Sequence, residues 1–428
     1  MSDRDRTPNA FRLNLEQQKN RAKDLLSAAK AGDPPALERL AAVGRDASCK
    51  LADAQLAIAR ELRFASWAKL KAHVQCLDRQ RAAIDGGGAA PDGDLKTLHV
   101  RCGSDIQLTL VEAGFTGGFL EHALPYCQGP ATRGPDRHEL MARFLVDAYP
   151  EARGGLVYER ELAGLPRGEE LLDRSAHNYE RVVIWMEHDS WDQLVLARLL
   201  SHYAEAQRPR ALELITLNEF PGGERFRGLG QLPPEALRLL WPTRKPVTSE
   251  ELALGHGAWL AITSDDPRDL LALAHSGMPA LPIMAPALRR HLRELPALEN
   301  GLSLTEQILL QTLSERSMVL GRVMWEMIQW REPLPWMTDL GLLHVVNDML
   351  KASEPVIVRT PPEPGQRWFA QRLAVTDLGL SVLRGARDWH SLNPPPRWVG
   401  GTRIAPGRPG WRWDQANGTV VYYQSDGS

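Results

Sequence analysis

Apolar residues recur at helical spacing through the first part of the chain. They stand three or four positions apart, as expected for helices that bury one face, and the first series is Leu15, Ala22, Leu25, Leu26 and Ala29. Asp33 followed by Pro34 predicts the start of another helix, and Ser66 predicts the N-cap of a later one. We therefore expect an N-terminal helical domain over residues 1–84.

The pattern changes after a glycine-rich stretch at 85–94, which has little to bury and is predicted to be a flexible linker. Short apolar runs then alternate with helical stretches, and 181–186 is the clearest buried strand. Alternation of strand and helix predicts a parallel sheet with crossover helices. We therefore expect a Rossmann-like α/β domain over 95–232. Further strands are predicted at 98–102, 119–124 and 212–217, and helices at 106–113, 137–148 and 192–206.

Residues 233–300 have a mainly helical pattern and form a predicted helical extension. Ser303 and Glu306 then make a capping box before an apolar helix. A second helix and two short strands follow within 301–390, an order typical of winged-helix modules; they are predicted at 340–350, 355–358 and 368–375.

The tail, 391–428, contains Asn417-Gly418 between two apolar runs, which is the strongest short signal for a β-hairpin. The predicted fold class is therefore α/β. It has a Rossmann-like parallel sheet core, an N-terminal helical domain and a C-terminal winged-helix-like α+β module.

Composition narrows the class of protein only slightly. A net charge of −2 gives no overall argument for a nucleic-acid or membrane partner. The four cysteines include no C-x-x-C pair, so a thiol zinc site is not expected. No run of about 18 apolar residues occurs, and the polar start does not resemble a signal peptide. We expect a cytoplasmic protein without a membrane partner.

An acidic turn follows the strand at 181–186. It brings Glu187, His188, Asp189 and Asp192 to the carboxyl end of a parallel strand, where open α/β sheets bind ligands, and Gln193 comes next. Carboxylates and imidazole suit a divalent metal or general acid–base catalysis, so the first four are candidate catalytic residues and Gln193 a substrate contact. The alternative is that the two aspartates cap the next helix. Capping explains one aspartate, but not Glu187 and His188.

Gly103-Ser104-Asp105, after the first strand of the sheet, is a second candidate site. A glycine at such a turn lets backbone N–H groups approach a phosphate, which makes Gly103 and Asp105 candidate substrate contacts. Ser104 can donate a hydrogen bond or act as a nucleophile, although the G-x-S-x-G context of a hydrolase is missing. Capping of the following helix by Ser104 or Asp105 remains an alternative.

The loop after the strand at 212–217 starts at the same predicted edge of the sheet. Its candidate substrate contacts are Asn218 and Glu219 at its beginning and Arg225 and Arg227 further on, where arginines can bind an anion. A solvated loop is the alternative. His99, inside a strand, is interpreted as a packed core histidine.

These motifs together resemble the bacterial family named domain of unknown function 1835, over about 95–415. The resemblance rests on Glu187-His188-Asp189 with Asp192-Gln193 and on the stretches 185–194, 218–221, 226–232 and 389–401. Where members of that family read Gly-Asp-Ser, this chain reads Gly103-Ser104-Asp105, and the resemblance implies no particular reaction. The N-terminal segment resembles the helical segment that precedes ankyrin repeats, on 15–19 and 64–71.

The favoured hypothesis is an enzyme that hydrolyses, or transfers a group on, a phosphorylated or nucleotide-like substrate, assisted by a divalent metal. An anionic small molecule or nucleotide is the expected partner. One alternative is a nucleic-acid-associated regulator that uses 301–390, although the helix at 340–350 carries no arginine. Another is a scaffold that binds a protein partner through 1–84.

Overall fold

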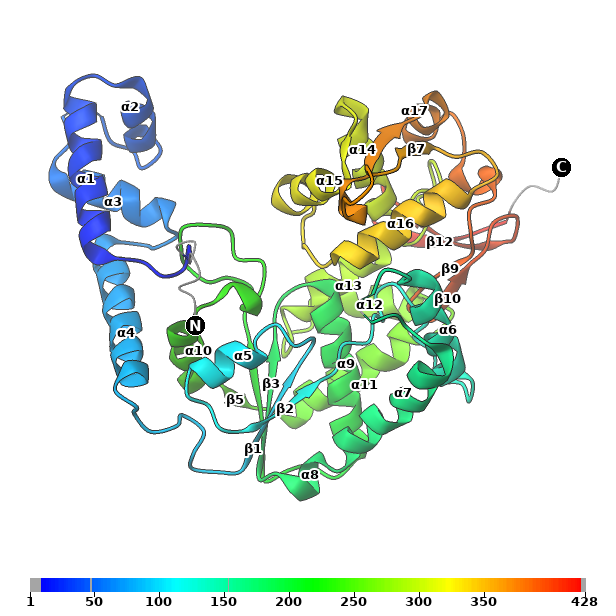
Figure 1. Ribbon diagram of the computed structural model, residues 1–428, viewed down its shortest axis with the longest axis horizontal. Coiled ribbons are helices and arrows are strands. Elements are labelled where there is room, and N and C mark those ends of the chain that lie inside the picture. Colours follow the sequence, from blue (N-terminus) through cyan, green and yellow to red (C-terminus); the bar gives the residue numbers. More distant parts are fainter. Residues whose placement is uncertain (1–8, 47, 153, 425–428) are drawn as a thin grey trace. The chain divides into compact units, whose positions relative to one another are not determined.

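The computed structural model describes residues 9–46, 48–152 and 154–424, and it is a mixed α/β structure (Figure 1). The chain divides into two units. The first contains Met1–Glu121, Tyr179–Glu187 and Arg210–Pro246, and the second contains His122–Asn178, His188–Pro209 and Val247–Ser428. Within the described residues, no helix is both long and apolar enough to cross a membrane.

The first unit combines N-terminal helices with a five-stranded sheet. Its helices are α1 (Leu15–Lys30), α2 (Pro34–Ala41), α3 (Leu51–Glu61), α4 (Trp67–Asp85), α5 (Gln107–Glu112) and α10 (Pro234–Leu240). Its strands are β1 (Thr97–Arg101), β2 (Gly118–Glu121), β3 (Arg181–Met186), β4 (Ala211–Thr216) and β5 (Lys245–Pro246). The strand order is β2-β1-β3-β4-β5, and each pair is parallel except β4 with β5.

The middle of the sheet is β3, in which every residue is buried. A strand with both faces covered needs a continuous apolar run, and the predicted strand at 181–186 matches β3 for this reason. On one face, Val183 and Trp185 share a core cluster with residues of α5 and α10. Trp185 stacks on Trp241 at a ring distance of 6.3 Å. The hydrophobic core of this unit therefore supports the two strands that carry the candidate site.

The order of the strands reverses between β1 and β3. From β1 the chain passes through α5 to β2 on one side, whereas β3 and β4 extend the sheet on the other side. The crossover connections leave in opposite directions at such a point, and a crevice is left outside the carboxyl ends of the two strands. Any ligand site of this sheet is therefore expected beyond Arg101 and Met186.

The N-terminal helices begin where the sequence predicts. Asp33 caps α2 by accepting a hydrogen bond from the Ala36 N–H, and Ser66 caps α4 in the same way. The buried Glu235 of α10 accepts hydrogen bonds from the Arg12 and Arg81 guanidinium groups. These ion pairs join the N-terminal segment and α4 to α10 within one unit.

The stretch between α4 and β1 contains one well-anchored residue. Asp92 is buried and accepts hydrogen bonds from the Gly117 N–H at 2.7 Å and from the Thr116 N–H at 3.0 Å. Its other neighbour is His99 Nε2 at 3.1 Å, and His99 is itself buried in β1. Burial raises the pKa of Asp92, but these hydrogen bonds outweigh it and hold the pKa well below its usual range.

The second unit is built mainly from helices. They are α6 (Arg137–Ala148), α7 (Tyr158–Asp173), α8 (Ser175–Asn178), α9 (Ser190–Glu205), α11 (Ser249–Ile262), α12 (Arg268–Ser276), α13 (Met284–Leu292), α14 (Leu304–Glu315), α15 (Leu320–Glu326), α16 (Asp339–Lys351) and α17 (Asp377–Leu383). Its strands are β6 (Met318–Val319), β7 (Ile357–Thr360), β8 (Arg372–Val375), β9 (Arg397–Val399), β10 (Thr402–Ile404), β11 (Gly410–Asp414) and β12 (Thr419–Tyr423). The long helix α9 packs against α11 and α13.

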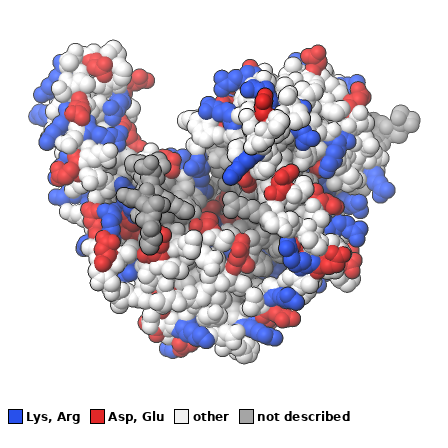
Figure 2. All heavy atoms as spheres, in the orientation of Figure 1, with Lys and Arg blue, Asp and Glu red and all other residues white. Residues whose placement is uncertain are grey.

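The C-terminal part of this unit has one core formed by α14, α15 and α16 with a small antiparallel sheet of order β6-β8-β7. The predicted capping box is present, because Ser303 and Glu306 exchange hydrogen bonds at the start of α14. The predicted hairpin is present as β11 and β12, with Gly418 at a φ of +62° in its turn. On the face drawn in Figure 2, basic and acidic side chains are intermixed, as the small net charge suggests.

A buried ion-pair network is centred on Arg290 of α13. The Arg290 guanidinium, which is 3% exposed, donates to both carboxylate oxygens of Glu332 at 2.8 and 2.7 Å. It also donates to Glu294 at 2.6 Å and to the Thr305 hydroxyl at 3.0 Å. A buried charge is tolerated when its hydrogen bonds are made in this way.

Candidate functional site

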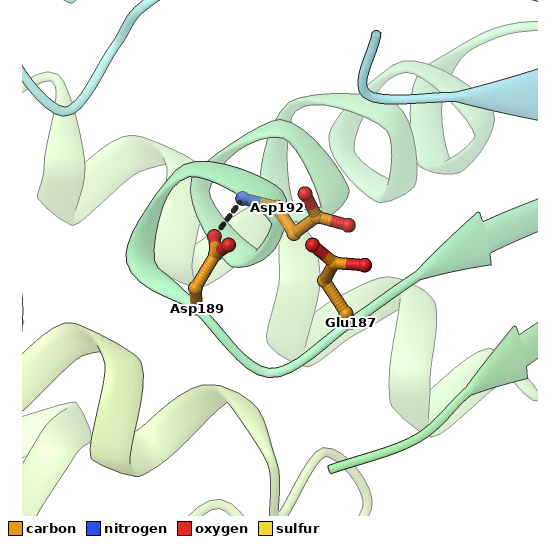
Figure 3. Close-up of side chains that lie close together, drawn as sticks. All are labelled: Glu187, Asp189 and Asp192. Atoms are coloured by element: carbon orange, nitrogen blue, oxygen red, sulfur yellow. Dashed lines mark hydrogen bonds between the residues drawn. The ribbon is translucent and has the colours of Figure 1, made fainter. Parts of the chain in front are cut away.

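The turn between β3 and α9 gathers three carboxylates (Figure 3). Glu187, Asp189 and Asp192 are all buried, and one oxygen of each lies within 4.8 Å of the others. All three belong to one short stretch of chain, so their proximity is a local property of the turn. The sequence predicted this grouping from the position of the residues at a strand end.

Asp189 is the N-cap of α9. Its Oδ1 accepts a hydrogen bond from the Asp192 N–H at 2.9 Å, as the dashed line in Figure 3 marks. The capping interpretation is therefore confirmed for this aspartate. Asp192 lies in the first helical turn, where the free N–H groups of the helix stabilise an anion. Helix geometry thus supports two of the three carboxylates.

Glu187 is held by residues of the first unit. Its Oε2 lies 3.0 Å from Arg101 Nη2 and also accepts a hydrogen bond from the Leu229 N–H. Arg101 is 2% exposed and binds both oxygens of Asp105 at 3.1 Å. One guanidinium thus joins a carboxylate beyond β1 to a carboxylate beyond β3.

Arg101 is not among the site residues predicted from the sequence. A signal was present, because an arginine inside the apolar run at 98–102 must be paired if that run is a buried strand. The pairing itself depends on β1 and β3 being neighbours, with Arg101 opposite Trp185 in the register.

The pair Gly228 and Gly230 fits closely over these carboxylates. A Cβ atom at Gly228 would overlap Glu187 Oε1 and lie 2.7 Å from Glu187 Oε2. A Cβ atom at Gly230 would lie 2.7 Å from Asp105 Oδ2. The backbone at Gly228 is extended, with a φ of 177°, so the lack of a side chain matters here for space alone. The absence of side chains at Gly228 and Gly230 thus has a steric explanation.

The turn after β1 requires its glycine, because Gly103 has a φ of +92°. Ser104 and Asp105 are exposed at this turn. Neither is the N-cap of α5, which is Ile106 without a side-chain hydrogen bond. The capping alternative for Ser104 and Asp105 is therefore wrong. The Asp105 carboxylate binds Arg101 instead, which gains it two charge-assisted hydrogen bonds.

The carboxyl edge of the sheet is acidic. Glu121 ends β2, and burial together with the negative charge of Asp105 raises the pKa of Glu121. The ends of β2, β1 and β3 therefore carry Glu121, Asp105 and Glu187, with the Arg101 guanidinium between the last two. Such an arrangement favours a cation over an anion at the strand ends.

The remaining candidates are placed less closely together. His188 and Gln193 are buried in the turn and in the first part of α9. Arg225 and Arg227 are partly buried, and the Arg227 N–H donates to Gln231 Oε1 at 2.6 Å. Within 9–46, 48–152 and 154–424, the side chains of Ser104, Asn218 and Glu219 have no hydrogen bond or ion pair, and all three are exposed.

No model of a known protein family matches this sequence, and neither does any curated protein. The chemistry of the site therefore follows from its donor atoms. Carboxylate oxygens are the ligands that Mg²⁺, Mn²⁺ and Ca²⁺ prefer. Three carboxylate oxygens within 4.8 Å of one another are close enough to converge on one such ion.

Proposed function

We propose that Glu187, Asp189 and Asp192 bind a divalent cation, and that the protein is an enzyme acting on a phosphorylated or nucleotide-like substrate by hydrolysis or group transfer. The observation that carries this proposal is the group of three buried carboxylate oxygens within 4.8 Å at the end of β3. Carboxylates so close together repel one another, and a cation relieves that repulsion. The reversal of strand order between β1 and β3 supports a ligand site at the same place.

A substrate with a phosphate group suits such a site. A bound cation of this kind polarises a phosphoryl oxygen and lowers the pKa of a bound water. The chain would contribute the left-handed turn at Gly103, where backbone N–H groups can approach a phosphate, and the imidazole of His188 as a base beside the carboxylates. Arg225 and Arg227 are proposed to contact the anionic part of the substrate, and Ser104 to donate a hydrogen bond to it. The supporting sheet is proposed to be Rossmann-like.

Thermal unfolding with and without cations tests the metal. Mg²⁺, Mn²⁺ or Ca²⁺ at 100 times its Kd should stabilise the protein by about 2.7 kcal/mol. Asp192→Asn should remove that gain, whereas Asp24→Asn, at an exposed position of α1, should keep it. In EDTA, Asp192→Asn loses one repelling charge but also the stabilisation of that charge by the start of α9, so its stability should stay close to that of the natural protein. A purely structural aspartate would instead make the variant less stable under both conditions.

Activity is tested with the same proteins. Release of phosphate from a panel of nucleotides and sugar phosphates should require the cation and be lost in Asp192→Asn. If no cation shifts the melting temperature, and Asp192→Asn behaves like the natural protein, the proposal is wrong.

A second candidate function is nucleic-acid-associated regulation through a winged-helix-like module in 301–390. The order of α14, α15, α16, β7 and β8 supports it, as do exposed arginines on and between the two strands, at Arg359, Arg367 and Arg372. The sequence of α16 argues against it, because a reading helix needs side chains for bases and phosphates and α16 has no arginine. DNA binding measured over a series of salt concentrations tests this second function. Each phosphate contact adds about one to the slope of log affinity against log salt concentration.

A further inference from the structure

A cavity of about 280 Å³ lies in the second unit and is lined by residues of α6, α7, α9 and α11. Three arginines line it: Arg133 before α6, Arg137 in α6 and Arg198 in α9. The acidic residues in its wall are Glu169 and Glu205. The arginines outnumber the carboxylates by one, and none of these residues belongs to the acidic turn.

Glu169 is the shared partner of the basic groups in this cavity. Its Oε2 accepts a hydrogen bond from Arg137 Nη2 at 2.9 Å and lies 3.3 Å from His138 Nε2, while its Oε1 lies 3.5 Å from Arg198 Nη2. Burial raises the pKa of Glu169, but the hydrogen bonds from Arg137 and His138 and the positive charges of these two residues together outweigh it and lower the pKa. Each guanidinium has five N–H donors, so one carboxylate leaves most of them available. Among the residues that the structure describes, none forms an ion pair with Arg133.

The neighbourhood of Arg198 is electropositive despite Glu169. The pKa of His122 is lowered to about 4, first by burial and second by the charge of Arg198. The pKa of His202 is also lowered, first by burial and second by the charge of Arg198. The Thr132 hydroxyl in the cavity wall is shielded from solvent, and no group in the described parts of the chain hydrogen-bonds to it. Buried polar groups normally have partners, so this hydroxyl is a donor left for a ligand.

One part of the cavity wall is apolar. Trp259 of α11 packs edge-on against Tyr126 at a ring distance of 4.8 Å, and the Arg198 guanidinium lies 5.9 Å from the Trp259 ring. Met141 and Leu165 complete this side. A few converging polar groups beside an apolar wall are typical of small-molecule sites.

We propose that this cavity is a second ligand site, which takes a small phosphate monoester with its phosphate on Arg133, Arg137 and Arg198 and its organic part against Trp259 and Met141. Guanidinium groups match phosphate oxygens in charge and geometry. The site is separate from the acidic turn, since Arg198 stands six residues beyond Asp192 on α9. That spacing is about 9 Å along the helix axis and about 240° around it.

Calorimetric titration of the full-length protein tests this site. The titrants are inorganic phosphate, glucose 6-phosphate and ribose 5-phosphate at constant ionic strength, with glucose as the uncharged control. EDTA is present throughout, so the outcome does not depend on a metal at the acidic turn. Both sugar phosphates should bind more tightly than inorganic phosphate, and glucose should not bind.

Variants locate the binding. Arg137→Gln and Arg198→Gln should each weaken sugar phosphate binding by about tenfold, the loss of one charge-assisted hydrogen bond. Glu169→Gln should strengthen sugar phosphate binding, because the carboxylate that competes for the arginines is gone. A merely structural role of Glu169 does not predict tighter binding. Arg174→Gln is the matched control, at a residue 70% exposed outside the cavity, and should change the affinity by less than about twofold.

Three results would overturn the proposal. The first is no binding of any phosphate by the natural protein, and the second is an equal effect of Arg198→Gln and Arg174→Gln. The third is binding only of glucose. If Arg198→Gln does not fold, Arg133→Gln replaces it, because this exposed side chain supports no packing.

Discussion

Replacing Gly228 by alanine is a direct probe of how the loop at 228–230 fits the carboxylates. The new methyl group would overlap Glu187 Oε1 and lie 2.7 Å from Glu187 Oε2. The extended φ of 177° suits alanine, so the backbone itself causes no strain. All of the cost must therefore come from the contact with Glu187.

The size of that cost follows from what holds Glu187. Its carboxylate cannot turn aside freely, because Oε2 is bound to Arg101 Nη2 at 3.0 Å and to the Leu229 N–H. Overpacking of a tight site costs about 1–3 kcal/mol, and a lost hydrogen bond to a charged group costs about 1.5–3 kcal/mol. The Glu187 carboxylate either stays in place and is overpacked, or moves and loses a hydrogen bond, so the two costs do not add in full. We therefore expect the free energy of unfolding to fall by about 2–3 kcal/mol. In a unit of this size, that corresponds to about 4–12 °C in melting temperature.

Scanning calorimetry measures this effect against two control variants. Gly164→Ala in α7, where a Cβ atom has nothing within 4 Å, should raise stability by about 0.5–1 kcal/mol. Gly230→Ala should cost less than Gly228→Ala, since the Asp105 side chain that it meets is 39% exposed and can move. A Gly228→Ala protein that melts with the natural one would refute the close contact between this loop and Glu187.

Three further predictions concern buried charges. Arg101→Ala should destabilise the protein by about 3–5 kcal/mol in urea unfolding, because Glu187 loses its buried partner, and Arg101→Lys should recover only part of this. Arg290→Ala should cost a similar amount by the same measurement, since Glu294 and Glu332 stay buried without it, whereas an effect below about 1 kcal/mol would contradict the network. Burial lowers the pKa of His122 and of His291 to about 4, below the unfolded value near 6.5. The two neutral histidines therefore contribute fully to folding stability above about pH 6.5, and this contribution is lost as the pH falls toward 4. Melting temperatures over this range should fall, and His291→Leu should lessen the fall.

The secondary structure was predictable where local signals are strong. Five consecutive apolar residues at 182–186 identify β3, and the Ser303–Glu306 capping box identifies α14. Helix α7 was not predicted, and its sequence explains why. It contains Pro166 and two glycines, and Leu172 is its only residue that is fully buried. Its helical period is therefore weak, and packing against α6 supports it instead.

The candidate site was predictable as a position and only partly as a set of contacts. Strand ends in a parallel sheet placed Glu187, Asp189 and Asp192 together, since their grouping is local. Arg101 was missed because its partners Asp105 and Glu187 stand 82 positions apart in the sequence and come together only when β1 and β3 are neighbours in the sheet. The Gly228 contact was missed for the same reason, since it joins loops that meet only in the folded sheet.

The most direct test of the proposed cation site is diffraction from crystals grown with Mn²⁺, recorded so that the anomalous signal of manganese is measured. Our proposal predicts an anomalous peak at coordination distance from the carboxylates of Glu187, Asp189 and Asp192, and its loss in Asp192→Asn. Carboxylates found in the same arrangement without a peak between them, at a Mn²⁺ concentration that saturates other acidic sites of the crystal, would contradict it.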